Sequence, residues 1–314
     1  MKVLSLFDGI SCGMIALQRA GIPVERYVAY EIDKYAVQVS EKNYPSIEHY
    51  GDVFEGDFTQ YRGFDLLLGG SPCTFWSIAK VRWGREVTPD GMGGKLFMEY
   101  VRALRESGCR YFLYENNYSI HKDIKDFISK QLGVQPITIN SALVSAQVRK
   151  RCYWTNIPNV SQPEDKGLCV KDILDYDCIN FIDYTKTHNI FWTKEDVSEY
   201  YNGMVQIGHI NKGSMGGRIY SVYGKSATIN ANGGGQGAKT GLYLIDGSVR
   251  KLTPLEAERL QTLPDNYTLC DGVSETSRYR GIGNGWTVDV IAHILKNISK
   301  EKEAPSVGGL FDLF

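Results

Sequence analysis

Residues 64–73 read Phe64-Asp65-Leu66-Leu67-Leu68-Gly69-Gly70-Ser71-Pro72-Cys73. The apolar run is bounded by glycine and proline, which predicts a buried strand that ends in a turn. The turn would carry the thiol of Cys73 at the end of the strand. In open α/β sheets, ligands bind at the edge where parallel strands end. The stretch therefore predicts one strand of such a sheet with a nucleophile at its edge.

Segments of the same kind lie on both sides of this strand. Short apolar stretches predict further strands at residues 3–6, 27–30 and 111–114. Apolar periodicity predicts helices at residues 14–20, 34–43, 95–106 and 124–131. This alternation of strands and helices predicts an α/β fold with a Rossmann-like, mostly parallel sheet covered by helices on both faces.

The pattern changes after Pro158. Residues 159–247 are rich in glycine, tyrosine and asparagine and rarely follow a helical period, which predicts a smaller domain of short strands and loops. Helix signals return at Thr253-Pro254, an N-cap residue followed by proline at the first helical position, and again at residues 288–299. We therefore expect a catalytic and cofactor-binding domain (1–158), a second domain (159–247), a return segment that completes the first domain (248–299) and a C-terminal tail (300–314).

The composition excludes several classes of protein. The chain has 314 residues, a net charge of −1 and no apolar run long enough to span a bilayer, and its first residues lead directly into a strand. These features predict a cytoplasmic protein without a signal peptide. The seven cysteines form no CxxC pair and do not accompany a histidine cluster, so we expect neither a disulfide framework nor a bound metal.

Charge is distributed unevenly along the second domain. Acidic side chains outnumber basic ones between residues 164 and 199, and basic side chains outnumber acidic ones between residues 203 and 251. A basic, glycine-rich stretch is a candidate for contact with phosphate groups.

Three further side chains accompany Cys73. Glu115 follows the predicted strand at 111–114, so it should lie beside Cys73 at the carboxyl edge of the sheet. Arg149 and Arg151 alternate along a later predicted strand, so both should point to one face. A thiol, a carboxylic acid and two guanidinium groups suit attack on C6 of a cytosine ring while the acid holds N3.

The first strand ends in the glycine-containing turn Phe7-Asp8-Gly9, and Glu31 closes the second strand. A carboxylate at that place is well sited to accept hydrogen bonds from both hydroxyls of a ribose. Asp52 lies at the end of the next probable strand. The turn has no phosphate-cradling lysine and does not match GxGxxG. These strand ends together predict a nucleoside ligand without a pyrophosphate.

In this order and at this spacing, the residues resemble the DNA (cytosine-5) methyltransferase family. The resemblance extends to the Gln-x-Arg-x-Arg motif at residues 147–151, to residues 250–261 and to the last motif at residues 281–288. Two positions depart from the family pattern. The chain has Pro72-Cys73-Thr74 in place of Pro-Cys-Gln, and Glu115-Asn116-Asn117 in place of Glu-Asn-Val. Neither departure removes a reacting group.

The resemblance implies a Rossmann-like domain that binds S-adenosylmethionine, joined to a smaller target-recognition domain at about residues 159–247. It implies that Phe7 stacks near the adenine, that Glu31 binds the ribose, that Asp52 binds the adenine amino group and that Ile32 and Val53 form the walls. The cofactor residues expected on this basis are Phe7, Asp8, Gly9, Glu31, Ile32, Asp52, Val53, Gly70, Pro72, Asn284, Trp286 and Thr287.

The implied reaction is transfer of a methyl group to C5 of a flipped-out cytosine in double-stranded DNA, with S-adenosylhomocysteine as the product. Cys73 would form a covalent bond to C6, and Glu115 would hold and protonate N3. Arg149 and Arg151 would contact the target base, its phosphate and the loop that follows Cys73. Residues 74–94 would form a lid over the extruded base. The expected DNA contacts are Ser77, Arg82, Lys212, Arg218, Lys225, Thr228 and Lys239.

Two alternatives remain open from the sequence: an RNA cytosine-5 methyltransferase of the same fold, and a catalytically silent DNA-binding relative. A cognate restriction endonuclease is a further possible partner. The tail ends in Asp312-Leu313-Phe314, which resembles the end of the motif that enters the bacterial sliding clamp. The clamp is therefore a second candidate partner.

Overall fold

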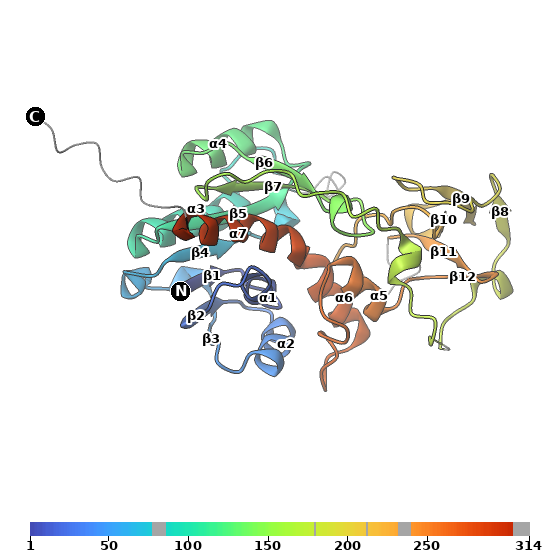
Figure 1. The fold of residues 1–314 in the computed structure, drawn as a ribbon, viewed down its shortest axis with the longest axis horizontal. Helices are drawn as coiled ribbons and strands as arrows, with labels where there is room; N and C mark the ends of the chain where they lie inside the picture. The colour runs from blue at the N-terminus through green and yellow to red at the C-terminus, as the bar shows by residue number, and fades with distance from the viewer. Residues whose placement is uncertain (77–85, 179, 212, 232–239, 304–314) are drawn as a thin grey trace, which may run out of the picture.

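The computed structural model describes residues 1–76, 86–178, 180–211, 213–231 and 240–303. A larger layered body holds the N-terminus, and a smaller body built on a second sheet lies at the opposite end of the molecule (Figure 1). Helices α5 (Pro254–Leu260) and α6 (Glu275–Asn284) lie between the two bodies in this view, and α7 (Val288–Glu303) lies on the larger one.

The larger body is built on a seven-stranded sheet in the order β3-β2-β1-β4-β5-β7-β6. The strands β1 to β5 are mutually parallel, and β7 runs antiparallel to both of its neighbours. Their bounds are β1 (Lys2–Leu6), β2 (Arg26–Tyr30), β3 (Glu48–Tyr50), β4 (Leu66–Gly69), β5 (Tyr111–Asn117), β6 (Ile137–Asn140) and β7 (Lys150–Thr155). The predicted α/β fold is confirmed.

Helices cover both faces of this sheet. Successive side chains of a strand point to opposite faces, so Val3 packs in one apolar cluster and Leu4 in another. The cluster of Val3 receives side chains from α1 (Cys12–Arg19), α2 (Lys34–Asn43) and α7 (Val288–Glu303). The cluster of Leu4 receives them from α3 (Met92–Ser107) and α4 (Lys122–Leu132). Helix α7 thus completes the first body from the far end of the sequence.

Two differences from the predicted bounds affect the site. Helix α3 begins at Met92 instead of residue 95, because the carboxylate of Glu86 accepts hydrogen bonds from the backbone N–H groups of Met92 and Gly93 at 3.0 and 3.1 Å. Strand β5 continues to Asn117 instead of ending at residue 114, because it pairs with β7 over its last residues. Glu115 therefore lies within a strand and not after it.

The second body contains a five-stranded sheet in the order β12-β11-β10-β9-β8. Its small apolar core includes Val205, Ile219 and Leu242. The strands are β8 (Ile190–Trp192), β9 (Gln206–Ile210), β10 (Arg218–Ser221), β11 (Leu242–Ile245) and β12 (Ser248–Arg250). Strand β12 lies beyond the boundary expected at residue 247, because it pairs antiparallel with β11 across the turn at Asp246 and Gly247.

The return to the first body begins at α5 (Pro254–Leu260) and continues through α6 (Glu275–Asn284). Thr253 caps α5 as predicted, and Glu256 completes a capping box with it. Glu256 is fully buried and also forms an ion pair with Arg250, with the nearest N–O distance at 2.7 Å. A buried charge needs such a partner, so this pair joins β12 to α5.

In the part of the chain that the structure describes, no helix is both long enough and apolar enough to cross a lipid bilayer. Over the same residues, no group of three or more histidine, cysteine or carboxylate side chains is arranged to hold a metal ion.

Candidate active site

A cleft lies at the edge of the large sheet where β1, β2, β4 and β5 end. It is closed on another side by the segment that links α6 to α7. Many of the side chains predicted from separate motifs meet here. The lining residues that were predicted from the sequence are Phe7, Asp8, Gly9, Glu31, Gly70, Pro72, Glu115, Arg149, Arg151, Asn284 and Trp286.

The turn after β1 has an unusual backbone. Phe7, Gly9 and Ser11 all have positive φ values, between 57° and 61°. The carboxyl group of Asp8 holds this turn by accepting hydrogen bonds from the hydroxyls of Ser5, Ser11 and Tyr27 at 2.5, 2.5 and 2.7 Å. Burial raises the pKa of Asp8. The observed contacts of Asp8 stabilise the turn, which brings the backbone of Gly9 to the cleft.

Glu31 follows β2 and faces the same turn. Its two carboxylate oxygens accept three backbone hydrogen bonds, from Gly9 at 2.8 Å, Ile32 at 2.8 Å and Asp33 at 2.7 Å. Burial raises the pKa of Glu31, and the hydrogen bonds from Asp33 and Gly9 act in the opposite direction. A carboxylate has about four lone-pair positions. The three backbone hydrogen bonds hold Glu31 rigidly and leave about one position, on Oε2, for a ligand.

The turn after β4 lies close against β5. A Cβ atom on Gly70 would lie 3.0 Å from the carbonyl oxygen of Glu115. The close contact between this turn and β5 therefore favours glycine at position 70. Asn116 donates a hydrogen bond to the carbonyl of Ser71 at 3.2 Å, and the hydroxyls of Ser71 and Tyr114 lie 2.6 Å apart. These contacts hold the turn that leads into the short helix η3 (Cys73–Phe75). The side chain of Cys73 lies outside the described part of the structure.

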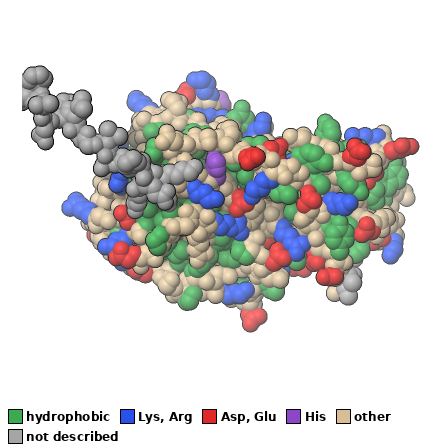
Figure 2. All heavy atoms as spheres, in the orientation of Figure 1, with side chains coloured by type: hydrophobic (Ala, Val, Ile, Leu, Met, Phe, Trp, Pro, Cys, Tyr) green, Lys and Arg blue, Asp and Glu red, His purple; other side chains and the backbone are tan. Residues whose placement is uncertain are grey.

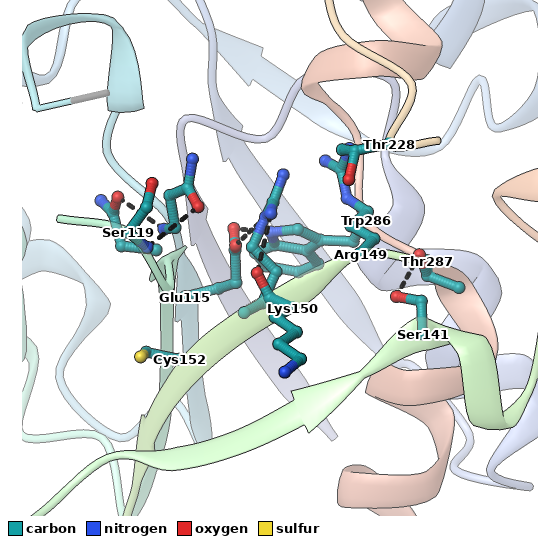
Figure 3. Close-up of polar contacts among 12 residues, drawn as sticks. Glu115, Ser119, Ser141, Arg149, Lys150, Cys152, Thr228, Trp286 and Thr287 are labelled. Carbon is teal, nitrogen blue, oxygen red and sulfur yellow. Dashed lines mark hydrogen bonds and ion pairs between the residues drawn. The ribbon is translucent and has the colours of Figure 1, made fainter. Parts of the chain in front are cut away.

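Glu115 lies between two donors. The Nε atom of Arg151 is 3.1 Å from Oε1. The indole N–H of Trp286 donates to Oε2 at 3.0 Å, and Figure 3 shows the Trp286 and Glu115 side chains facing one another. The Arg151 and Glu115 side chains are only 11% and 12% exposed, so the pair is largely shielded from water. Lys150 extends away from Glu115 in Figure 3. The cleft thus contains a carboxylate whose two oxygens have separate partners.

The model of the family described as C-5 cytosine-specific DNA methylase matches residues 1–300. The chain belongs to this family. Among similar proteins, the type II methyltransferase M.HhaI from Haemophilus parahaemolyticus is 29% identical over 95% of this chain and 94% of its own length. The type II methyltransferase M.Bsp6I from Bacillus sp. is 28% identical over 96% of this chain and 99% of its own length. Both relatives therefore cover the two bodies of the molecule.

Solved structures agree on the fold of this cytosine methylase. A structure of the Entamoeba histolytica methyltransferase EhMeth has a TM-score of 0.71 and 15% sequence identity, and it covers 96% of this chain and 98% of its own. A structure of the S. pombe Dnmt2 methyltransferase has a TM-score of 0.66 at 18% identity, over 96% and 99% of the two chains. At these identities the likeness concerns the fold alone.

The expected strand position of Arg149 in this methylase is wrong. Strand β7 begins at Lys150, and Arg149 precedes it. The side chain is 4% exposed, and its guanidinium donates to the carbonyls of Ile229 at 2.8 Å, Gly283 at 3.1 Å and Gly285 at 3.0 Å. Arg149 therefore joins its own segment to two distant ones at the wall of the cleft, whereas Arg151 contacts Glu115.

Sequence reasoning missed a buried polar network behind this wall. The amide of Gln147 donates to Oε1 of Gln261 at 2.8 Å, and the hydroxyl of Thr287 donates to the same oxygen at 2.7 Å. Thr287 is 2% exposed and does not line the cleft, so its expected contact with the cofactor does not fit its position. The signal for Gln147 was available, because it opens the Gln-x-Arg-x-Arg motif.

Three other expected cofactor residues lie outside the cleft lining. Ile32 is 77% exposed beside Glu31, whereas Val53 is 4% exposed and packs in the core cluster of Leu4. The carboxylate of Asp52 accepts a hydrogen bond from the backbone of Phe54 at 3.0 Å, which starts the short helix η1 (Val53–Glu55). Ile32 and Asp52 stay predictions, and the burial of Val53 argues against its expected role as a wall.

The expected DNA contacts divide into three groups. Ser77, Arg82, Lys212 and Lys239 lie outside the described residues. Lys225 does not fit a phosphate contact, because it is fully buried and donates to the carbonyls of Ala142 and Ser145 at 2.7 and 3.3 Å. Burial also lowers the pKa of Lys225. Arg218 is partly exposed on β10, and Thr228 donates to the carbonyl of Val148, so both stay predictions.

Proposed function

We propose that this enzyme transfers a methyl group from S-adenosylmethionine to C5 of a flipped-out cytosine in double-stranded DNA, through a covalent bond between Cys73 and C6. The observation that carries the proposal is the pairing of Glu115 with Arg151 and Trp286, beside the turn that leads to Cys73. A positioned carboxyl group next to a nucleophile fits the two steps that cytosine chemistry requires.

The cleft fits the cofactor by its donors and acceptors. Glu31 offers the open position of its rigidly held carboxylate, on Oε2, to a ribose hydroxyl, and the positive φ of Gly9 brings backbone close to the same place. Phe7 lines the cleft and offers a ring for the adenine. Exposed Ile32 is an apolar surface that a bound base would cover. When bound, the cofactor supplies an electrophilic methyl group.

The side chains of the enzyme prepare the cytosine for that group. The thiolate of Cys73 adds to C6, and the electron pair displaced toward N3 is neutralised as N3 receives a proton held by Glu115. C5 then becomes nucleophilic. After methylation, the C5 proton is lost to solvent and the Cys73 thiolate is expelled from C6, which restores the C5–C6 double bond. N3 returns its proton to the Glu115 carboxylate, so the aromatic ring and the acid are both regenerated. A cytosine inside a duplex cannot be attacked on its face, so the base must leave the stack.

The second sheet is proposed to read the DNA, within a domain of about residues 159–247 extended to include β12. On the face that Figure 2 shows, acidic and basic side chains are interspersed over both bodies. The candidate phosphate contact among the described residues is Arg218 on β10.

A cognate endonuclease remains a proposal. The proposed sliding-clamp motif lies outside the described residues, and a pull-down that compares the full chain with one truncated after Ser306 tests it.

Methyl transfer measured side by side on duplex DNA and on tRNA tests the substrate class. We expect incorporation into DNA that bisulfite sequencing locates at cytosine within a defined sequence. Incorporation into tRNA alone would support the RNA alternative. No incorporation on either substrate, with intact cofactor binding, would support a silent DNA-binding relative.

Glu31→Gln is expected to weaken cofactor binding at least about tenfold, which corresponds to the loss of one hydrogen bond to a charged group. Both oxygens of Glu31 already accept backbone N–H groups. The amide nitrogen of glutamine would therefore face a donor in either orientation. Isothermal titration calorimetry with S-adenosylhomocysteine measures the change. The exposed Glu41→Gln serves as the control, and unchanged affinity in Glu31→Gln would contradict the proposed ribose contact.

Salt dependence distinguishes Arg218 from Lys225. Arg218→Gln should lower the slope of log K against log salt for DNA binding by about one, the effect of removing one phosphate contact. Lys225→Met should leave that slope unchanged and lower the melting temperature, because its ammonium group is buried against backbone carbonyls. Binding titrations at several salt concentrations measure both slopes. An unchanged slope for Arg218→Gln would show that β10 does not contact phosphate.

A further inference from the structure

The contact between Trp286 and Glu115 joins two segments that are 171 residues apart. Trp286 follows α6 and is half-buried in the wall of the cleft. Its indole N–H donates to Oε2 of Glu115 at 3.0 Å, while Arg151 approaches Oε1 at 3.1 Å. Each oxygen of the carboxylate therefore has a donor on its own side, and the rotation of the carboxyl group is determined by both.

The backbone that carries Trp286 is held firmly. The carbonyl of the preceding residue, Gly285, accepts hydrogen bonds from the side chains of Arg149 and Gln261, both at 3.0 Å. A Cβ atom on Gly285 would lie 3.1 Å from the sulfur of Cys12, so this segment packs closely against α1. Trp286 is thus presented to the cleft from a fixed support.

The space around the contact is also restricted. A Cβ atom on Gly70 would lie 3.2 Å from Oε2 of Glu115 and 3.4 Å from Nε1 of Trp286. Gly70 belongs to the turn that leads to Cys73. The carboxylate oxygen, the indole nitrogen and the turn before the proposed nucleophile therefore meet at one place in the cleft.

We propose that Trp286 is a positioning residue for the catalytic carboxyl group, an inference that rests on the proposed role of Glu115. A carboxylate has about four lone-pair positions. Trp286 and Arg151 take one on each oxygen, which leaves about two positions for the base. A carboxyl group free to rotate would spend part of its time with these positions turned away from N3, and small displacements of a reacting group cost much of its effect.

Trp286→Phe tests this proposal because phenylalanine keeps an aromatic ring in the cleft wall and removes the N–H donor. We expect the single-turnover rate of methyl transfer to fall about tenfold, the typical effect of one hydrogen bond to a charged group. Affinities for S-adenosylhomocysteine and for DNA should change by less than about threefold, because the ring remains.

A double mutant shows whether Trp286 acts through Glu115. Adding Trp286→Phe to Glu115→Gln should slow the reaction no further, because the carboxylate that the indole orients is absent. Trp154→Phe is the matched control. Trp154 also donates an indole hydrogen bond, to Ser129 at 2.9 Å, but it is buried in the core. This control should lower the melting temperature and leave the single-turnover rate unchanged.

The possible outcomes distinguish the positioning role of Trp286 from the proposed role of Glu115. A Trp286→Phe rate within twofold of the unmodified enzyme overturns the inference. So does a loss of rate that saturating cofactor restores, or one that is equally large in the Glu115→Gln background. A near-normal rate for Glu115→Gln alone overturns the proposed function of Glu115 itself, whereas a slow Glu115→Gln with a normal Trp286→Phe overturns only the positioning role.

Discussion

Cys73→Ser is expected to abolish methyl transfer while cofactor binding and the melting temperature stay nearly unchanged. Serine keeps the size of the side chain, but its hydroxyl is a far weaker nucleophile than a thiolate. The turn that carries residue 73 is held by contacts of Ser71 with Tyr114 and Asn116, which the substitution leaves in place. Radiolabelled methyl transfer to duplex DNA measures the activity, and calorimetry measures the binding.

A duplex that contains 5-fluorocytosine at the target should trap the unmodified enzyme through Cys73. Cys12 and Cys109 are poor candidates, because burial raises the pKa of Cys12 to about 12 and that of Cys109 to about 11. Cys152→Ser is a matched control and should keep full trapping, since Cys152 is buried and lies apart from the polar contacts of Glu115 (Figure 3). Peptide mapping that locates the adduct on Cys12 or Cys152 would overturn the assignment.

Glu115→Gln should slow the chemical step by at least about a hundredfold, the usual contribution of a placed general acid. Two effects act in the same direction. Glutamine cannot give N3 a proton as a carboxylic acid does. Its amide nitrogen would also face a donor, because Arg151 and Trp286 occupy opposite oxygens of the carboxylate. Single-turnover kinetics at saturating cofactor and DNA isolate this step.

Glu48→Gln provides the control for the loss of a glutamate–arginine pair. Glu48 lies on β3, where it pairs with Arg26 at 2.7 Å and both side chains are 40% exposed. Removal of this surface pair should leave the rate unchanged, because exposed ion pairs contribute little to stability. If Glu115→Gln retains near-normal turnover, another group must hold N3. If Glu115→Gln loses DNA binding together with turnover, Glu115 has a structural role in the cleft.

The sequence by itself determined the elements whose causes are local. Helix α2 has the predicted bounds, and α5 begins after the predicted N-cap at Thr253. The strand that leads to Cys73 was also predicted within residues 64–73, and it spans Leu66–Gly69. These features depend on apolar period, capping and turn residues within a few positions of one another. Because the parallel strands end at one edge, Glu31, Glu115 and the turn before Cys73 could be assigned to one cleft.

Only the tertiary structure decided which polar side chains contact Glu115 and which bind backbone carbonyls instead. Arg149 and Arg151 are equivalent in the motif. Arg149 is nonetheless bound by carbonyls that lie 80 to 136 residues away, whereas Arg151 reaches Glu115. Lys225 belongs to a basic stretch, yet it is buried, because the carbonyls of Ala142 and Ser145 satisfy its ammonium group. The contact of Trp286 with Glu115 likewise joins distant segments. A buried donor needs hydrogen-bond acceptors, and here segments that are distant in the sequence supply them. No local sequence pattern indicates which distant segments these are.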